Sequence, residues 1–169
     1  HGSPSDTYSR APRASEGCVV LANDDLTRLG QYIQNGKTPV IIAEQVEWLD
    51  HETLDARRND LTAAIDQWRQ DWESRDTERL LRHYSAAFRS GSQDLQSFGA
   101  SKQKVNAAKS WIKVGLSNVS LMLYPERRDF ALVSFVQDYQ SNNLNDRTAK
   151  RQFWSRENGR WKIIHETSL

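Results

Sequence analysis

The chain has 169 residues, which is enough for one ordinary domain, or for a complete domain with part of a second. Its 23 basic and 22 acidic residues leave a net charge of +1, so no global field draws it to nucleic acid or to a membrane surface. The single cysteine excludes an intramolecular disulfide, and no apolar run approaches the roughly 18 residues of a membrane span. A chain that begins at His1 rather than Met is expected to be a processed, cloned or truncated product.

The N-terminal part, residues 1–47, is predicted to be an incomplete domain. Residues 1–17 are rich in Ser, Pro, Arg and Gly, as loops are, and an apolar run predicts a strand over 18–21. A second strand is predicted over 38–49, with Pro39 at its edge. Two strands and one intervening helix cannot enclose a core, so this part is interpreted as the end of a domain whose beginning is missing.

The intervening helix is predicted to begin with Asn23 or Asp24 as its N-cap and to stop at Gly36, because apolar residues recur at helical spacing between them. After the second strand, residues 48–59 are charged and poor in apolar side chains. They are interpreted as a linker or as the first turn of the next helix. A separate domain is expected over 60–169.

Three amphipathic helices are predicted at the start of this domain, over 60–75, 76–88 and 101–115. Asp76 or Thr77 is the expected cap of the second helix. The inward stripes of the three helices are expected to be Leu61, Ile65, Trp68 and Trp72; Leu80, Leu81, Tyr84 and Phe88; and Val105, Ala108 and Ile112.

Four strands are predicted after the helices, over 117–126, 129–141, 148–157 and 160–169. The runs are alternating or apolar, and the turn-prone segments "ERRD", "NNLND" and "ENG" separate them. Helices followed by an antiparallel meander make an α+β domain.

This order resembles the nuclear transport factor 2-like fold, also called SnoaL-like, in which three helices pack on a strongly curved antiparallel sheet to form a cone with an open pocket. The resemblance covers about residues 60–169. It rests on "WRQDWESRD", "HYSAAF", "VSFVQDYQS" and "GRWKIIHE". Each motif alone is weak, and their joint order is the signal.

Cys18 raises the question of nucleophilic chemistry. An unperturbed thiol with a pKa of about 8.5 is mostly protonated at neutral pH, so a catalytic cysteine needs a base. It also needs donors for the oxyanion that forms on attack at a carbonyl, and a turn containing Gly17 could aim backbone N–H groups at that point. His1 is the histidine nearest in sequence. Without that context, a lone cysteine before an apolar run is more often a buried small hydrophobe.

"HGS" at the start of the chain and "SEGC" about seventeen residues later resemble the histidine and Ser/Thr-x-Gly-Cys segments of the L,D-transpeptidase family. The resemblance implies that Cys18 is the nucleophile, that His1 is its base and that the Gly2 carbonyl orients the imidazole. Gly17 and Cys18 would supply oxyanion donors, and Ser15 would hold the turn. Many family members have a second histidine directly before the Gly-Cys pair, whereas this chain has glutamate there.

The same resemblance implies acyl transfer through a thioester, on the peptide stem of peptidoglycan and without a metal or other cofactor. Cys18 would attack the carbonyl between the third stem residue and the terminal D-alanine, which would leave protonated by His1. Water as the acceptor gives a carboxypeptidase and an amine gives a transpeptidase, and the sequence does not separate the two. A SnoaL-like domain after this segment is similar to the cell-shape subgroup in Gram-negative bacteria, which implies a periplasmic or secreted protein.

A ligand pocket is the second candidate site. Alternation on the strand "VSFVQDYQS" places Val133, Phe135, Gln137 and Tyr139 on one face, and Lys150 on the next strand could bind a carboxylate. Trp68 is a further candidate from the helices. The alternatives are that the polar groups only satisfy the backbone and that Lys150 is solvated.

Two broader alternatives remain open. The protein could be a non-catalytic module that binds wall material or forms a homodimer through its sheet, with Cys18 as a remnant. The pocket could itself be enzymatic, but Asp71, Asp76 and His83 are expected to be surface, cap and stripe residues rather than a catalytic set. Glu166 is expected to pair with a basic neighbour such as Arg151 or Lys162.

Overall fold

The structure is a computed structural model of residues 1–169, and it describes all of them except 9, 10, 12, 13 and 16. Contacts divide the chain into two compact units, His1–Val40 and Ile41–Leu169, and each is described by itself. Among the described residues, no helix is both long and apolar enough to cross a membrane.

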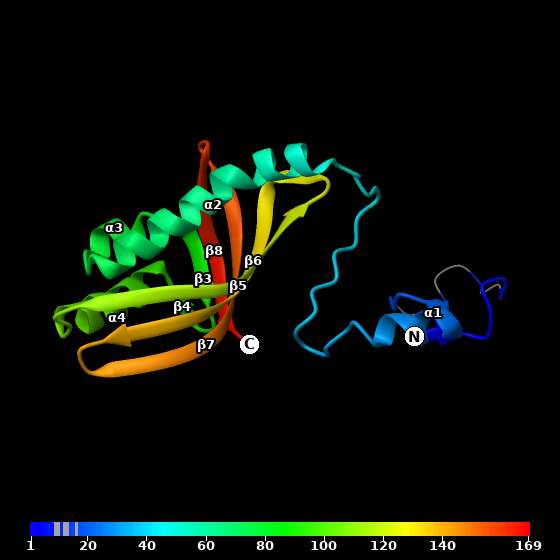
Figure 1. Ribbon diagram of the computed structural model, residues 1–169, viewed down its shortest axis with the longest axis horizontal. Helices are drawn as coiled ribbons and strands as arrows, with labels where there is room; N and C mark the ends of the chain where they lie inside the picture. The colour runs from blue at the N-terminus through cyan, green and yellow to red at the C-terminus, as the bar shows by residue number, and fades with distance from the viewer. Residues whose placement is uncertain (9–10, 12–13, 16) are drawn as a thin grey trace. The chain divides into compact units, whose positions relative to one another are not determined.

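In its described residues, the first unit has two short parallel strands and the helix labelled α1 in Figure 1. β1 (Gly2–Ser3) pairs with β2 (Leu21–Ala22), and α1 (Asn23–Gly30) follows directly. The prediction of a strand over 18–21 is wrong in position. Pairing begins only where the Leu21 N–H donates to the His1 carbonyl at 3.1 Å.

Helix α1 is shorter than predicted, and neither Asn23 nor Asp24 caps it. Ala22 occupies the N-cap position and makes no side-chain cap. The helix ends well before Gly36, because the Gln34 carbonyl accepts two backbone hydrogen bonds in a separate turn. None of the helix residues is buried, so packing does not extend it.

The strand predicted over 38–49 does not form, because no other strand in the described part of the chain pairs with this segment. Its backbone bonds to side chains instead. The Tyr124 hydroxyl donates to the Ile42 carbonyl at 3.0 Å, and the Gln45 N–H donates to the Glu126 carboxylate at 3.1 Å. These bonds replace the ladder that a strand would need.

Helix α2 (His51–Glu73) begins in the segment that was predicted to be either a linker or the first turn of the next helix, and the second alternative is correct. The carboxylate of Asp50 accepts a hydrogen bond from the Thr53 N–H at 2.7 Å, and this N-cap starts the helix. Residues 51–59 are therefore its first turns rather than a linker. The predicted inward stripe is confirmed, since Leu61, Ile65, Trp68 and Trp72 are all buried.

The second predicted helix is only one turn long. α3 (Thr77–Leu81) begins at Asp76, which caps it as predicted, but strand β3 (Tyr84–Ser90) follows. Positions 84 and 88 share a face in a helix and also in a strand, so the burial of Tyr84 and Phe88 does not separate the two structures. Parallel pairing of β3 with β8 decides the outcome.

The third predicted helix is displaced toward the N-terminus. β4 (Gln93–Asp94) leads into α4 (Leu95–Ala107), where Asp94 and Ser97 form a capping box. The buried face contains Phe98 and Asn106, whereas Val105 is 45% exposed. The prediction missed this N-terminal signal and so assigned the wrong inner face to the helix.

The four predicted strands are confirmed as β5 (Ile112–Tyr124), β6 (Arg127–Ser141), β7 (Leu144–Glu157) and β8 (Arg160–Ser168). They extend into a six-stranded sheet of order β4-β3-β8-β7-β6-β5, in which β3 and β8 pair in parallel and all other neighbours are antiparallel. The sheet is therefore mixed, not purely antiparallel.

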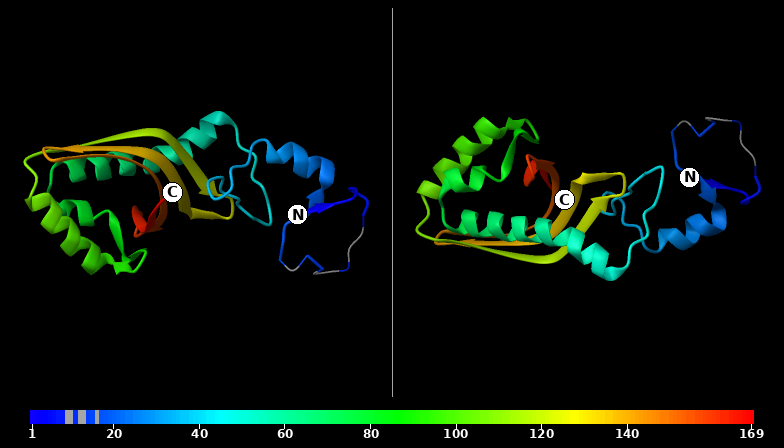
Figure 2. Two further views of the ribbon diagram at one scale, coloured as in Figure 1. Left: turned by 90° about the horizontal axis from the view of Figure 1, so that it is seen from below. Right: turned by 90° about the horizontal axis from the view of Figure 1, so that it is seen from above.

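The sheet curves around the helices, which lie on its inner side (Figures 1 and 2). The core between the two layers is rich in aromatic side chains. Trp68 and Trp154 are fully buried there, together with Phe88, Leu61 and Ile163. This is the α+β arrangement that the sequence predicts for residues 60–169.

Candidate functional site

The inner face of β6 carries the alternation that the sequence predicts. Val133, Phe135, Gln137 and Tyr139 are all buried. The Gln137 side-chain oxygen and the Tyr139 hydroxyl have no hydrogen-bond partner in the described part of the chain. They therefore do not serve to satisfy the backbone, and each is left with unused hydrogen-bonding capacity.

A polar chain crosses the same face on β7 and β8. The Lys150 ammonium donates to one oxygen of the Glu166 carboxylate at 2.8 Å, and the Gln152 amide donates to the other at 2.8 Å. The Trp154 indole N–H then donates to the Gln152 carbonyl oxygen at 3.1 Å. Glu166 therefore pairs with a basic neighbour as predicted, but that neighbour is Lys150, and Lys162 donates to the Arg82 carbonyl instead.

Lys102 of α4 brings a second ammonium group to this cluster. Its Nζ lies 4.2 Å from the centroid of the Trp72 ring and 5.2 Å from that of Phe98. No hydrogen-bond acceptor or carboxylate within bonding distance faces it among the described residues. Burial lowers the pKa of Lys102 to about 8, with Lys150 acting in the same direction and Glu166 opposing.

Aromatic rings connect the two parts of the site. Trp72 lies between Lys102 and Tyr139, with 5.6 Å between the centroids of the Trp72 and Tyr139 rings. Trp68 packs against Trp72 at 5.5 Å and is fully buried, with its indole N–H donating to the Tyr84 hydroxyl at 3.1 Å. Trp68 therefore lies in the core behind the site.

The charges of the cluster do not cancel. Burial opposes ionisation of Glu166, but Lys150 and Lys102 outweigh it and hold the pKa of Glu166 below its usual value. Burial and the negative Glu166 raise the pKa of Tyr84 well above its usual value, so its hydroxyl stays protonated. Two ammonium groups thus face one carboxylate, and the arrangement can accept one further anion.

Sequence reasoning missed Lys102. The helix that carries it was placed too late in the chain, so its buried face was assigned to other residues. The spacing of Phe98, Lys102 and Asn106 would have placed the lysine on that face, since positions four residues apart lie on one side of a helix.

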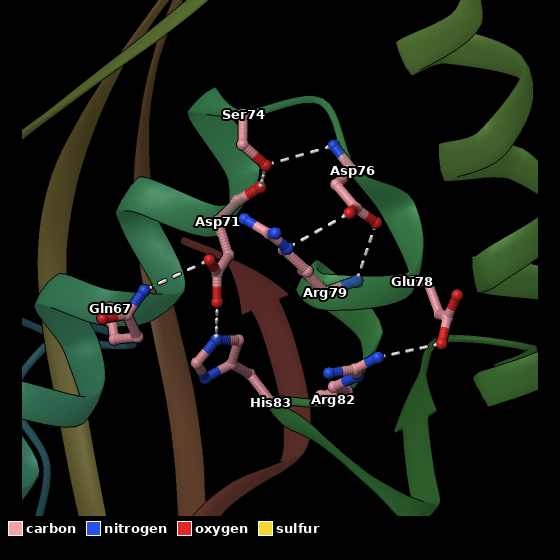
Figure 3. A network of polar contacts seen from close by, with 8 residues as sticks. All are labelled: Gln67, Asp71, Ser74, Asp76, Glu78, Arg79, Arg82 and His83. Atoms are coloured by element: carbon pink, nitrogen blue, oxygen red, sulfur yellow. Dashed lines mark hydrogen bonds and ion pairs between the residues drawn. The ribbon is translucent and has the colours of Figure 1, made fainter.

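Asp71 and His83 form a separate pair outside this cluster (Figure 3). Their side chains meet at 2.7 Å, and the Gln67 amide donates to the other Asp71 oxygen at 3.1 Å. The neighbouring contacts of Asp76 with Arg79 are those of a helix cap. Asp71 is thus a half-buried partner of His83 rather than a surface residue, and the network joins α2 to the end of α3.

In the first unit, the structure brings the two predicted catalytic segments together through their backbones. The His1 N-terminal ammonium donates to the Val19 carbonyl at 2.8 Å, and Gly2 pairs with Leu21. Cys18 is exposed, and its N–H donates to the Ser15 carbonyl at 3.0 Å. Among the described residues, no hydrogen bond joins the His1 imidazole to the Cys18 thiol.

The turn before the cysteine has the backbone that the sequence suggests. Gly17 has φ of +86° and open space where a side chain would stand. This left-handed conformation favours glycine. Glu16, the residue at the position of the second family histidine, lies outside the described residues.

Among the described residues, no group of three or more His, Cys, Asp or Glu side chains is placed to hold a metal ion.

Comparison with protein families gives a match to the Cds6 C-terminal NTF2-like domain over residues 60–167. Comparison with curated proteins gives no match.

Several solved structures are similar. Bd1075 of Bdellovibrio bacteriovorus is 31% identical with a TM-score of 0.86, and the match covers 100% of this chain and 59% of that one. The helical cell shape determining protein Pgp2 of Campylobacter jejuni is 23% identical with a TM-score of 0.73, covering 99% of this chain and 59% of that one. An NTF2-like protein of unknown function from Pseudomonas putida is 15% identical with a TM-score of 0.58, and the match covers 68% of this chain and 86% of that one. The chain thus spans about three fifths of the length of the first two.

We predict that Lys102→Met raises the free energy of unfolding at pH 7 by about 2 kcal/mol, because it removes a charge whose burial is unfavourable. Below pH 8 the ammonium is charged in both the folded and the unfolded chain, so the full cost is present. Between the folded pKa of about 8 and the ordinary value of 10.5, the folded lysine is neutral while the unfolded one is charged. The advantage of the variant therefore fades over that range.

Chemical denaturation at pH 7 and pH 10 measures the difference. Lys104→Met is the matched control, since Lys104 is an exposed lysine of the same helix and should change stability little at either pH. A Lys102→Met variant that is less stable than the wild type at pH 7 would contradict the assignment of an unfavourable buried charge.

Proposed function

Because the chain belongs to the family of Cds6 C-terminal NTF2-like domains, we propose that it is part of a cell-wall remodelling protein and that its domain binds the carboxylate of a peptidoglycan stem peptide. Lys102 carries this proposal, because its ammonium is held over aromatic rings without an acceptor beside an ion pair that is already complete. The similarity to a cell shape determining protein supports the cell-wall setting.

The residues around Lys102 suit a carboxylate ligand. The side chain of Lys150 is 18% exposed, so the cluster reaches solvent at this residue. The Tyr139 hydroxyl can donate a hydrogen bond to a ligand, and the Gln137 oxygen can accept one from a ligand N–H. A peptide end, which has a carboxylate beside an amide N–H, matches both kinds of group.

We propose further that Cys18 is a nucleophile of the L,D-transpeptidase type, in a periplasmic or secreted protein. Its thiolate would attack the carbonyl before the terminal D-alanine, and the C–N bond of that residue would break with a proton supplied by His1. Water or an amine would then release the acyl group from sulfur. The pairing of the two strands, which places the His1 backbone against Val19, supports this proposal.

For the binding site, we predict that a stem tetrapeptide ending in D-alanine binds the chain and that Lys102→Met weakens this binding at least tenfold, because the ammonium contributes a charge-assisted contact. Isothermal titration calorimetry measures both affinities. Lys104→Met should bind like the wild type, and the C-terminal amide of the peptide should bind more weakly than the acid. Equal affinity of Lys102→Met and the wild type would refute the site.

For Cys18, the experiment uses the protein at its full natural length with tetrapeptide muropeptides. We expect D-alanine release or crosslink formation, loss of both in Cys18→Ala, and a carbapenem adduct on the wild type alone. The products separate a carboxypeptidase from a transpeptidase. If the thiol reacts with an alkylating probe no faster than free cysteine and Cys18→Ala keeps full activity, the protein is a binding module and Cys18 is not its nucleophile.

A further inference from the structure

A hollow of the domain lies where α2 begins, and it shares no residue with the lysine cluster formed by Lys102, Lys150 and Glu166. Its volume is about 430 Å³, which is within the range of small-molecule sites. Most of its lining is apolar. The apolar lining includes Leu49, Leu54, Leu121, Leu123, Tyr124 and Trp161.

One wall of this hollow is the segment 41–49, which precedes α2. The Arg57 guanidinium anchors this segment through a bidentate ion pair with Glu47, with N–O distances of 2.7 and 2.8 Å. Tyr124 and Glu126 bind the backbone of the segment closer to its N-terminal end, as described above. The wall is thus fixed to the domain at several points, and the hollow is pre-formed.

Four arginines and two acidic residues line the hollow, so its charge is +2. Three of the arginines are paired: Arg57 and Arg128 with Glu47, and Arg156 with Asp60. Arg58 is the exception. Among the described residues no carboxylate pairs with its guanidinium.

The Arg58 side chain is also incompletely hydrogen-bonded. Its Nη2 donates to the Leu121 carbonyl at 3.0 Å, but its Nε is buried and has no hydrogen-bond partner among the described residues. The indole N–H of Trp161, which also lines the hollow, is buried without a partner as well. Both groups are donors, so what the hollow lacks is an acceptor. A half-buried guanidinium without a counter-charge favours an anionic acceptor over a neutral one.

We propose that this hollow binds an amphiphilic carboxylate, with the acid group on Arg58 and an apolar chain against the leucines and Tyr124. The planar fork of a guanidinium matches the two oxygens of a carboxylate better than any single-point contact does. The apolar lining would bury the chain of the ligand from water. Such a ligand contacts the segment that connects the domain to the unit containing Cys18.

The test uses decanoate as the probe, below its micellar concentration, with the whole chain and isothermal titration calorimetry. We expect decanoate to bind and Arg58→Met to weaken it at least tenfold. Arg160→Met, which removes an exposed arginine outside the hollow, should bind like the wild type. Acetate has the acid group without the alkyl chain, and decyltrimethylammonium has the alkyl chain without the acid group. Each should bind with lower affinity than decanoate.

Selective ¹⁵N labelling of tryptophan gives a second readout that does not depend on affinity. Decanoate should shift the indole resonance of Trp161, assigned with Trp161→Phe. Any of three outcomes would overturn the proposal: decyltrimethylammonium and decanoate bind with equal affinity, Arg58→Met binds decanoate as tightly as the wild type does, or decanoate does not bind. If Arg58→Met fails to fold, Arg58→Lys replaces it, since it keeps the charge and loses the fork and should still weaken binding. None of these outcomes bears on the lysine cluster, where the stem peptide is the probe.

Discussion

The ion pair between Lys150 and Glu166 is the constraint on which the interior of the domain depends. A carboxylate buried inside an apolar layer is tolerated only when it is paired and hydrogen-bonded, and Glu166 receives one bond from Lys150 and one from Gln152. The register of β7 against β8 places Gln152 directly opposite Glu166. Because each oxygen of this carboxylate already accepts a hydrogen bond from another side chain, the charge of Lys102 has no partner of its own among the described residues.

That imbalance suits the site to binding an anion. Glu166 is held ionised and Tyr84 is held neutral near neutral pH, whereas Lys102, with a pKa of about 8, can exchange a proton there. In the proposed function, the acyl-transfer reaction would take place at Cys18, which lies in the other unit of the chain. The domain would then bind the substrate. The unfavourable burial of Lys102 would lower the stability of the domain in return for that contact.

Much of the fold could be predicted from the sequence where one periodicity was unambiguous. The stripe from Leu61 to Trp72 repeats at helical spacing only, and the alternation from Val133 to Tyr139 repeats at strand spacing only. Prediction failed where local pattern left two outcomes open. Tyr84 and Phe88 suit a helix or a strand equally, and only pairing with a strand at the far end of the chain selects the strand.

The candidate site was predictable in part for the same reason. Gln137, Tyr139 and Lys150 follow from alternation along neighbouring strands, whose register brings them to one face. Lys102 comes from a helix whose start was misplaced, and its ring contacts with Trp72 depend on tertiary packing that no local pattern encodes. The pairing of Glu166 with Lys150 likewise depends on strand register.

The pKa of Lys102, followed by NMR of its side chain with and without the stem tetrapeptide, tests the central claim most directly. The account predicts a value near 8 in the free protein and a clear rise when the peptide acid is bound, with no rise for its C-terminal amide. A value near 10.5 in the free protein that the peptide leaves unchanged would contradict it.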